Sequence, residues 1–376
     1  IMANKEAFCS YPVESLFLET GGNVKPCCSL IGTMGNIKDK PLKEILEGGV
    51  AREIRESITK GEWHPQCYDC KLAESKGMKT QRNSEEIQAK FDGMKDIIHP
   101  DYFKLHDTDI RWNNTCNLSC TYCDSHFSSQ WANAKNNTAW KQKQDAPEIL
   151  IEYLEEHKDT YKEANLLGGE PLLLKPNLKL LETFPDIKYN VLSNLSAPIQ
   201  TNKIAQKLLT LPNVQWQVSF ETIGKRFEYV RNGAQWETFE ANIKYIYENA
   251  GKRILVFPTY CVYPALHLDE FCDYIYNSPY FDTRNTMWTG LVHPHQLDVT
   301  LQSPTIKRKA LDELDKVLAK RDIPEIHAFR EGLLPTLNKP RHTDITMAYH
   351  KQIEKWLKKD VTLKDVFPDL YEDLIG

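Results

Sequence analysis

Between residues 105 and 295, short runs rich in β-branched and aromatic residues alternate with stretches in which apolar residues recur at helical spacing. The strand-like runs are 107–112, 164–168, 188–193, 214–220, 253–260 and 286–292. The helical stretches between them are 146–158, 176–184, 199–210, 235–250 and 267–277. This alternation predicts parallel strands joined by helical crossovers, and therefore the α/β class. Six such units favour an incomplete β/α barrel or an open α/β sheet.

The segments on either side of this region have a different character. Residues 1–85 are rich in cysteine and contain a helical pattern at 42–58 that the Gly48-Gly49 pair interrupts. Residues 86–105 resemble a connector, and residues 301–376 are mostly helical in pattern. We therefore predict four segments: 1–85, 86–105, 106–300 and 301–376.

The composition narrows the class of protein. The chain has 376 residues, of which 41% are apolar and 26% charged, as in ordinary globular proteins. Its net charge of −5 offers no electrostatic case for nucleic acid or for an acidic membrane. No apolar run reaches the roughly 18 residues of a membrane span, and the first residues do not resemble a signal peptide. We therefore expect a cytoplasmic protein, where thiols stay reduced.

Ten cysteines are the unusual feature, because so many reduced thiols call for a metal or redox explanation. Cys261 and Cys272 are isolated, and we expect them to be small buried apolar residues. Cys116, Cys120 and Cys123 have the spacing C-x3-C-x2-C directly after the first expected strand. Three thiolates can hold three irons of a cubane and leave the fourth open. A zinc site completed by His126 is the alternative.

Polar residues follow the next three expected strands, at the ends where a barrel carries its chemistry. They could converge on one ligand that has ammonium, carboxylate and ribose groups. Turn formation and helix capping are the alternative roles for several of them. These residues are Gly168, Gly169 and Glu170, then Ser193 and Asn194, then Ser219, Glu221 and Arg231.

The N-terminal cysteines form a second group. Cys67 and Cys70 have the C-x2-C spacing of metal ligands. With Cys9 and Cys27 they make four thiolates, and Cys28 is the substitute for Cys27. These four could hold either a structural zinc or a fully ligated iron–sulfur cluster.

Two motifs in this order resemble the radical S-adenosylmethionine (SAM) superfamily: CNLSCTYC at 116–123, with an aromatic residue before its last cysteine, and GGEP at 168–171. The resemblance implies a partial (β/α)6, TIM-like barrel. It also implies that the three cysteines bind a 4Fe–4S cluster whose fourth iron is chelated by SAM. The further SAM-binding residues that it implies are Tyr122, Gly168, Gly169, Glu170, Ser193, Asn194, Ser219 and Arg231. The chain departs from the family at Glu221-Thr222, where Asp-Gly is usual.

The N-terminal region resembles the SPASM and twitch modules, in which four cysteines hold an auxiliary 4Fe–4S cluster. Its Gly-x-Val-x-Pro-Cys hairpin, Gly-Asn-Ile turn and Cys-x-x-Cys pair carry that likeness. The familiar modules follow the barrel, whereas this one precedes it. A closed cluster of this kind implies electron transfer or a role in shaping the substrate pocket.

The family's chemistry is reductive cleavage of SAM to a 5′-deoxyadenosyl radical, which abstracts a hydrogen atom from a substrate. An external one-electron donor, such as flavodoxin or ferredoxin, is then required. The SPASM-like region favours a peptide or protein side chain as substrate. Dehydrogenation or epimerisation of a sugar, nucleoside or other small alcohol is the alternative, and a non-catalytic, metal-stapled binding protein is a remote one.

Overall fold

The computed structural model describes residues 7–75, 80–137, 147–291, 293–339 and 343–375. The chain divides into two compact units, which are described separately. The first comprises Ile1–Asn114, Gln142–Val191 and Leu211–Val214, and the second comprises Thr115–Lys141, Leu192–Thr210 and Gln215–Gly376. Within the described residues, none of the helices is long and apolar enough to cross a lipid bilayer.

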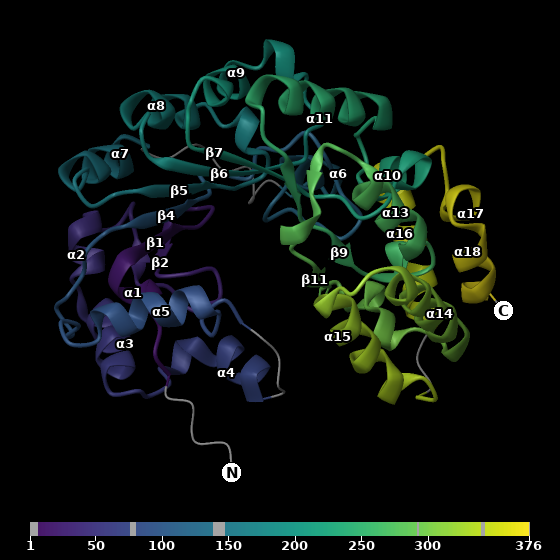
Figure 1. The fold of residues 1–376 in the computed structure, drawn as a ribbon, viewed down its shortest axis with the longest axis horizontal. Coiled ribbons are helices and arrows are strands. Elements are labelled where there is room, and N and C mark those ends of the chain that lie inside the picture. Colours follow the sequence, from purple (N-terminus) through teal and green to yellow (C-terminus); the bar gives the residue numbers. More distant parts are fainter. Residues whose placement is uncertain (1–6, 76–79, 138–146, 292, 340–342, 376) are drawn as a thin grey trace. The chain divides into compact units, whose positions relative to one another are not determined.

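The first unit is built on a sheet in the order β6-β5-β4-β1-β2-β3. The strands β1, β4, β5 and β6 run parallel, while β2 and β3 form an antiparallel extension. Figure 1 shows helix α7 beside β5. The strands are β1 Ser15–Leu18, β2 Asn23–Lys25, β3 Gly35–Asn36, β4 Asp107–Ile110, β5 Glu163–Leu166 and β6 Lys188–Ser193. The helices are α1 Tyr11–Glu14, α2 Leu42–Leu46, α3 Gly49–Thr59, α4 Tyr68–Ser75, α5 Glu85–Met94, α7 Pro147–Glu156 and α8 Pro176–Thr183, with 3-10 turns η1 Pro65–Cys67 and η3 Pro171–Leu173.

Alternation along β4, β5 and β6 gives this sheet one apolar and one polar face. The row Ile110, Leu166 and Val191 is buried on the apolar face. On the other face, Asn190 donates to Asn165 (2.7 Å) and Asn165 donates to Asp109 (2.6 Å), across neighbouring strands. The apolar row contributes to the core, whereas the polar row is held by cross-strand hydrogen bonds.

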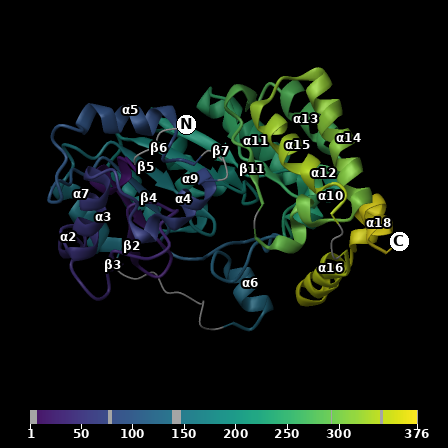
Figure 2. The same ribbon diagram turned by 90° about the horizontal axis from the view of Figure 1, so that it is seen from below.

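The second unit contains the strands β7, β8 and β10, paired in the order β10-β8-β7, and a separate pair β11-β9. Figure 2 shows α13, α14 and α15 grouped together in this unit. The strands are β7 Val214–Val218, β8 Ile254–Val256, β9 Thr259–Tyr260, β10 Phe281–Asp282 and β11 Thr289–Gly290. The helices are α6 Ser129–Ala134, α9 Lys203–Leu209, α10 Gly224–Val230, α11 Trp236–Ala250, α12 Val262–Ala265, α13 Leu268–Asn277, α14 Pro304–Lys320, α15 Pro324–Leu333, α16 Thr343–Leu357, α17 Leu363–Val366 and α18 Pro368–Ile375.

Local signals explain where several of these helices begin and end. Ser303 accepts a hydrogen bond from the Ile306 N–H, and Pro304 occupies the first turn of α14. Helix α11 ends at Gly251, whose φ of 65° is left-handed. The expected α/β class and the helical C-terminal region are confirmed, since parallel strands alternate with helices and five helices follow residue 300 among the described residues.

Two strand predictions were wrong in detail. The expected strand 253–260 is interrupted at Pro258, because proline has no N–H to donate to a sheet. The strand that continues the parallel sheet after β8 is Phe281–Asp282, not 286–292. Residue 292 lies outside the described residues, and in the described part of that run, 286–291, β11 pairs with β9. A strand of two residues is too short to show an alternation of apolar and polar side chains. Trp288 packs on Phe271 and is not part of the parallel sheet that contains β8.

Candidate functional site

Residues 116–123 form a tight loop whose three cysteines are held by backbone hydrogen bonds. The Cys116 sulfur accepts from the Leu118 N–H at 3.4 Å. The Cys120 carbonyl accepts from Trp131 Nε1 at 2.8 Å and from the Cys123 N–H at 3.0 Å. Hydrogen bonds from backbone N–H groups to sulfur are a means by which proteins tune iron–sulfur clusters, so this donor arrangement suits the expected group.

The loop is anchored to the segment that follows α10. The N–H groups of Ser119 and Thr121 donate to the carbonyls of Asn232 and Val230, at 2.9 and 2.8 Å. Gly233 lies against this loop with a φ of 100°, and a Cβ there would come within 3.1 Å of the Asn117 carbonyl oxygen. Glycine is therefore required for the close approach of these two backbones.

Burial raises the pKa of the Cys120 thiol and raises that of Cys123 well above its ordinary value, with neighbouring cysteines adding to the shift at Cys123. Both groups are therefore protonated at neutral pH until a metal displaces the proton. Cluster assembly on this loop is coupled to proton release.

Tyr122, Glu221 and Arg231 form a polar triangle beside the cysteines, in which Glu221 and Arg231 are buried and Tyr122 is half-buried. The Tyr122 hydroxyl donates to Glu221 Oε2 at 2.9 Å, and Arg231 Nη2 donates to the same carboxylate oxygen at 2.8 Å. Burial alone would lower the pKa of Arg231, but the Glu221 charge and Tyr122 raise it. Within the described part of the chain, Arg231 Nε and Glu221 Oε1 are buried without a hydrogen-bond partner. Unpaired buried groups suit a site that takes a polar ligand.

Ser193 and Asn194 lie where β6 ends. The Ser193 hydroxyl accepts from the Leu195 N–H at 3.0 Å, and Asn194 Nδ2 donates to the Asn117 side-chain oxygen at 3.0 Å. Asn194 Nδ2 also lies 3.9 Å from the Cys116 sulfur. Ser219 is half-buried, and its N–H donates to the Ser193 carbonyl at 3.4 Å. The structure thus places Asn194 directly at the cysteine loop.

Gly168, Gly169 and Glu170 lie in the first unit, after β5. Gly168 has a φ of 122°, and a Cβ there would lie 2.8 Å from Leu174 Cδ1. The Gly169 N–H donates to the Asn113 carbonyl at 3.4 Å. The Glu170 carboxylate is buried and accepts from the Leu172 N–H at 3.1 Å, at the start of η3. The capping role is therefore present for Glu170, and its expected role toward the SAM amine stays a prediction.

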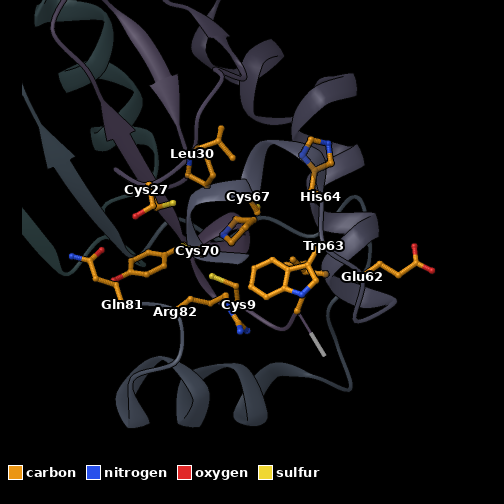
Figure 3. A pocket seen from close by; sticks show the side chains of 16 residues that line it. Cys9, Cys27, Leu30, Glu62, Trp63, His64, Cys67, Cys70, Gln81 and Arg82 are labelled. Carbon is orange, nitrogen blue, oxygen red and sulfur yellow. The ribbon is translucent and has the colours of Figure 1, made fainter. Parts of the chain in front are cut away.

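Four cysteines from three separate segments line one pocket in the first unit (Figure 3). Cys9 precedes α1, Cys27 follows β2, and Cys67 and Cys70 lie on η1 and α4. Burial raises the pKa of Cys9 to about 12 and that of Cys67 to about 11. At both Cys9 and Cys27 burial raises the pKa of the thiol, and the neighbouring backbone, at Tyr11 and at Ser29, opposes that rise. Four thiols around one pocket are a ligand set that fits an iron–sulfur cluster.

Cys28 lies differently from its neighbour. It is exposed, it is not one of the pocket-lining residues, and its thiol contacts the Gln81 side-chain oxygen at 3.5 Å. The choice of Cys27 as ligand and Cys28 as substitute stays a prediction, and the structure shows which of the two faces the pocket.

Arg82 also lines this pocket, and sequence reasoning missed it. An isolated arginine in a polar stretch, KTQRNSE, carries no signal that distinguishes it from a solvated surface charge. In the structure Arg82 is only 6% exposed. Cys261 and Cys272, in contrast, were expected from the sequence to be small buried apolar side chains. In the structure both are fully buried in the second unit.

Among the residues that the structure describes, no three His, Cys, Asp or Glu side chains gather closely enough to ligate a single metal ion.

Comparison with protein families gives two matches. Residues 110–275 match the radical SAM superfamily, and residues 9–71 match the SPASM iron–sulfur cluster-binding domain. Residues 110–275 therefore form a radical SAM domain. Its SPASM domain precedes the radical SAM domain, as the order of motifs predicted. These matches confirm iron–sulfur clusters and SAM as the cofactors of this radical SAM protein.

Several solved structures are similar to this chain. Native anSMEcpe with bound AdoMet has 14% sequence identity and a TM-score of 0.41, with 58% of this chain and 62% of that chain covered. Streptococcus suis SuiB bound to S-adenosylmethionine has 14% identity and a TM-score of 0.40, with 71% and 64% covered. This chain thus spans a little over six tenths of the length of those proteins. No curated protein gives a significant match in sequence.

Proposed function

We propose that this protein is a radical SAM enzyme that cleaves SAM reductively and abstracts a hydrogen atom from a peptide or protein side chain. The observation that carries the proposal is the joint presence of two cysteine sets. One is the open set of three on the 116–123 loop, and the other is the closed set of four that lines a pocket in a SPASM domain.

When bound, the open cluster supplies the electron that cleaves SAM and so produces the hydrogen-abstracting radical. The chain's own residues hold the parts in place. Cys116, Cys120 and Cys123 would ligate three irons. Their loop is fixed by Trp131 and by the backbone at 230–232.

Arg231 and Glu221 present buried, unpaired polar atoms next to this loop. A guanidinium N–H can bind the carboxylate of SAM, and a carboxylate oxygen can accept from an ammonium or hydroxyl group. We assign Arg231 to the SAM carboxylate, and Gly168, Gly169 and Glu170 to its amine. Ser193, Asn194 and Ser219 then serve the ribose or the carboxylate.

The peptide preference is supported by the SPASM domain, because the modules that it resembles occur in enzymes that mature ribosomally made peptides. A one-electron donor such as flavodoxin or ferredoxin would complete the reaction. The four-cysteine cluster would carry an electron or shape the pocket, since a fully ligated cluster has no open position for substrate.

Reconstitution of the full chain under anaerobic conditions tests the cofactor part. We expect about eight iron and eight sulfide per chain, the content of two cubanes. Reduced protein should form 5′-deoxyadenosine from SAM, and the triple variant with Cys116, Cys120 and Cys123 changed to Ala should form none. Continued turnover by that variant would show that the catalytic assignment is wrong.

Isotope transfer tests the substrate class. Extracts of cells grown on deuterated medium are separated into a peptide fraction and a small-molecule fraction, and each is incubated with the reduced enzyme and unlabelled SAM. We expect deuterium in 5′-deoxyadenosine from the peptide fraction, detected by mass spectrometry. Transfer from the small-molecule fraction alone would instead support a sugar, nucleoside or other alcohol as substrate.

A further inference from the structure

Arg82 is a buried cation at the pocket that the four N-terminal cysteines share. It is 6% exposed and lines the pocket together with Cys9, Cys27, Cys67 and Cys70. Figure 3 shows its side chain beside Cys9 and Trp63. Since the sequence carries no sign of this role, the position of Arg82 is information that only the structure supplies.

The guanidinium of Arg82 is held on several sides. Its Nε donates to Glu74 Oε1 at 3.0 Å, and its Nη2 donates to Glu74 Oε2. Its Nη1 donates to the Phe8 carbonyl at 2.7 Å, and the group lies over the Trp63 ring, 4.6 Å from the ring centre. The fork of two hydrogen bonds to one carboxylate is the geometry that arginine favours. The charge is therefore fixed in position.

Glu74 is part of the same arrangement. Its side chain is 11% exposed, and Thr80 donates to its Oε1 at 2.6 Å. Glu74 follows Cys70 on α4, and Phe8 immediately precedes Cys9. Arg82 thus connects two of the segments that carry cysteines. A purely structural role would by itself explain these contacts.

The charge of Arg82 nevertheless lies at the cysteines, because its side chain lines the same pocket as Cys9, Cys67 and Cys70. The carboxylate of Glu74 belongs to the same helix as Cys70. A fixed cation close to a site favours any state of that site that carries more negative charge, and a close anion disfavours it.

Iron–sulfur clusters change charge when they are reduced, since the uptake of one electron adds one negative charge. Their reduction potentials depend on local charge, on hydrogen bonds to sulfur and on solvent exposure. We propose that Arg82 is a positioning residue whose fixed positive charge raises the reduction potential of the auxiliary cluster, and that Glu74 partly offsets it. This inference rests on the proposed cluster at the four cysteines.

The experiment is a redox titration of the full chain, monitored by electron paramagnetic resonance with dithionite as reductant. The triple Ala variant of Cys116, Cys120 and Cys123 serves as background, so that only the auxiliary cluster contributes a signal. For Arg82→Gln we expect the ratio of reduced to oxidised cluster, measured at one fixed solution potential, to fall about tenfold. For a one-electron couple this equals a lowering of the reduction potential by about 59 mV.

Three further variants separate charge from structure. Glu74→Gln should shift the potential in the positive direction, because it removes the opposing charge while the amide still accepts from Arg82. Arg82→Lys should stay near the parent potential. Arg52→Gln is the matched control, since it removes the same charge from an exposed pair with Asp101 in the same unit, and it should leave the potential unchanged.

The outcomes are distinct. Shifts of opposite sign for Arg82→Gln and Glu74→Gln support the proposal, whereas unchanged potentials or shifts of the same sign overturn it. Should Arg82→Gln fail to take up iron, the Glu74→Gln shift decides: a positive shift supports the proposal and none overturns it. If the triple Ala variant with Arg82 and Glu74 unchanged binds no iron at all, the proposed auxiliary cluster is absent. Iron analysis shows this before any titration.

Discussion

Arg231 and Glu221 form a buried ion pair in which Nη2 lies 2.8 Å from Oε2, with side chains 5% and 0% exposed. The Tyr122 hydroxyl shares the same carboxylate oxygen. Burial raises the pKa of Tyr122 well above its ordinary value, so its hydroxyl stays protonated and acts as donor. The pair therefore ties the aromatic residue of the cysteine motif to the segment after β7, although the family usually has Asp-Gly where this chain has Glu221-Thr222.

Arg231→Leu should destabilise the apo protein by about 3–5 kcal/mol, because it leaves the Glu221 charge buried and unpaired. The measurement is the free energy of unfolding in urea. The double variant Arg231→Leu with Glu221→Leu should recover much of this loss, since both charges are removed together. If the double variant were no more stable than Arg231→Leu, the pair would not be the source of the effect.

Replacement of single cysteines should separate Cys27 from Cys28. Cys27→Ser is expected to lower the iron content from about eight to about four per chain, because one cubane loses a ligand. Cys28→Ser should keep about eight, since Cys28 does not line the pocket. Iron and sulfide analysis after anaerobic reconstitution makes the comparison, and the reverse pattern would assign Cys28 as the ligand.

Gly168→Ala should destabilise the protein by about 1–3 kcal/mol, the usual cost of a non-glycine residue in a sparsely populated conformation. It should also weaken SAM binding if the backbone of GGEP approaches the ligand. Gly49→Ala is the control, because a Cβ at Gly49 meets nothing within 4 Å and Gly49 lies in helix α3. Equilibrium dialysis with labelled SAM and urea unfolding test the two effects, and equal behaviour of both variants would count against the GGEP assignment.

Asp109 should make stability depend on pH. Burial raises its pKa from 3.8 to about 6, with Asp107 and Glu163 adding to the shift and the hydrogen bond from Asn165 opposing it. Because the folded-state pKa is above the unfolded one, the stabilising contribution is fully present below about pH 4 and is lost as the pH rises through 6.

Asp109→Asn keeps an acceptor for the Asn165 amide and removes the charge. This variant should be more stable than the parent chain at pH 7 and about equally stable at pH 4. Urea unfolding at the two pH values makes the comparison. An equal gain at both would mean that the ionisation of Asp109 is not responsible.

Local patterns in the sequence predicted much of this fold. The helices near 147–156, 236–250 and 268–277 were located because the spacing of apolar residues is a property of a single segment. Strand β1 had no such signal, since all four of its residues are buried and show no alternation. Its parallel partner β4 lies about 90 residues further along the chain, and only folding brings the two together.

The residues of the candidate site also divide into those that the sequence alone identified and those whose role only the structure showed. The sequence by itself determined the two cysteine groups, the GGEP turn and the family to which they point, because ligand spacing and glycine turns are local properties. Only the tertiary structure decided that Cys27 rather than Cys28 faces the pocket, that Glu221 is the partner of Arg231, and that Arg82 is a fixed charge beside the cysteines. Burial and charge pairing depend on residues distant in the chain, and no local pattern records which of them will meet.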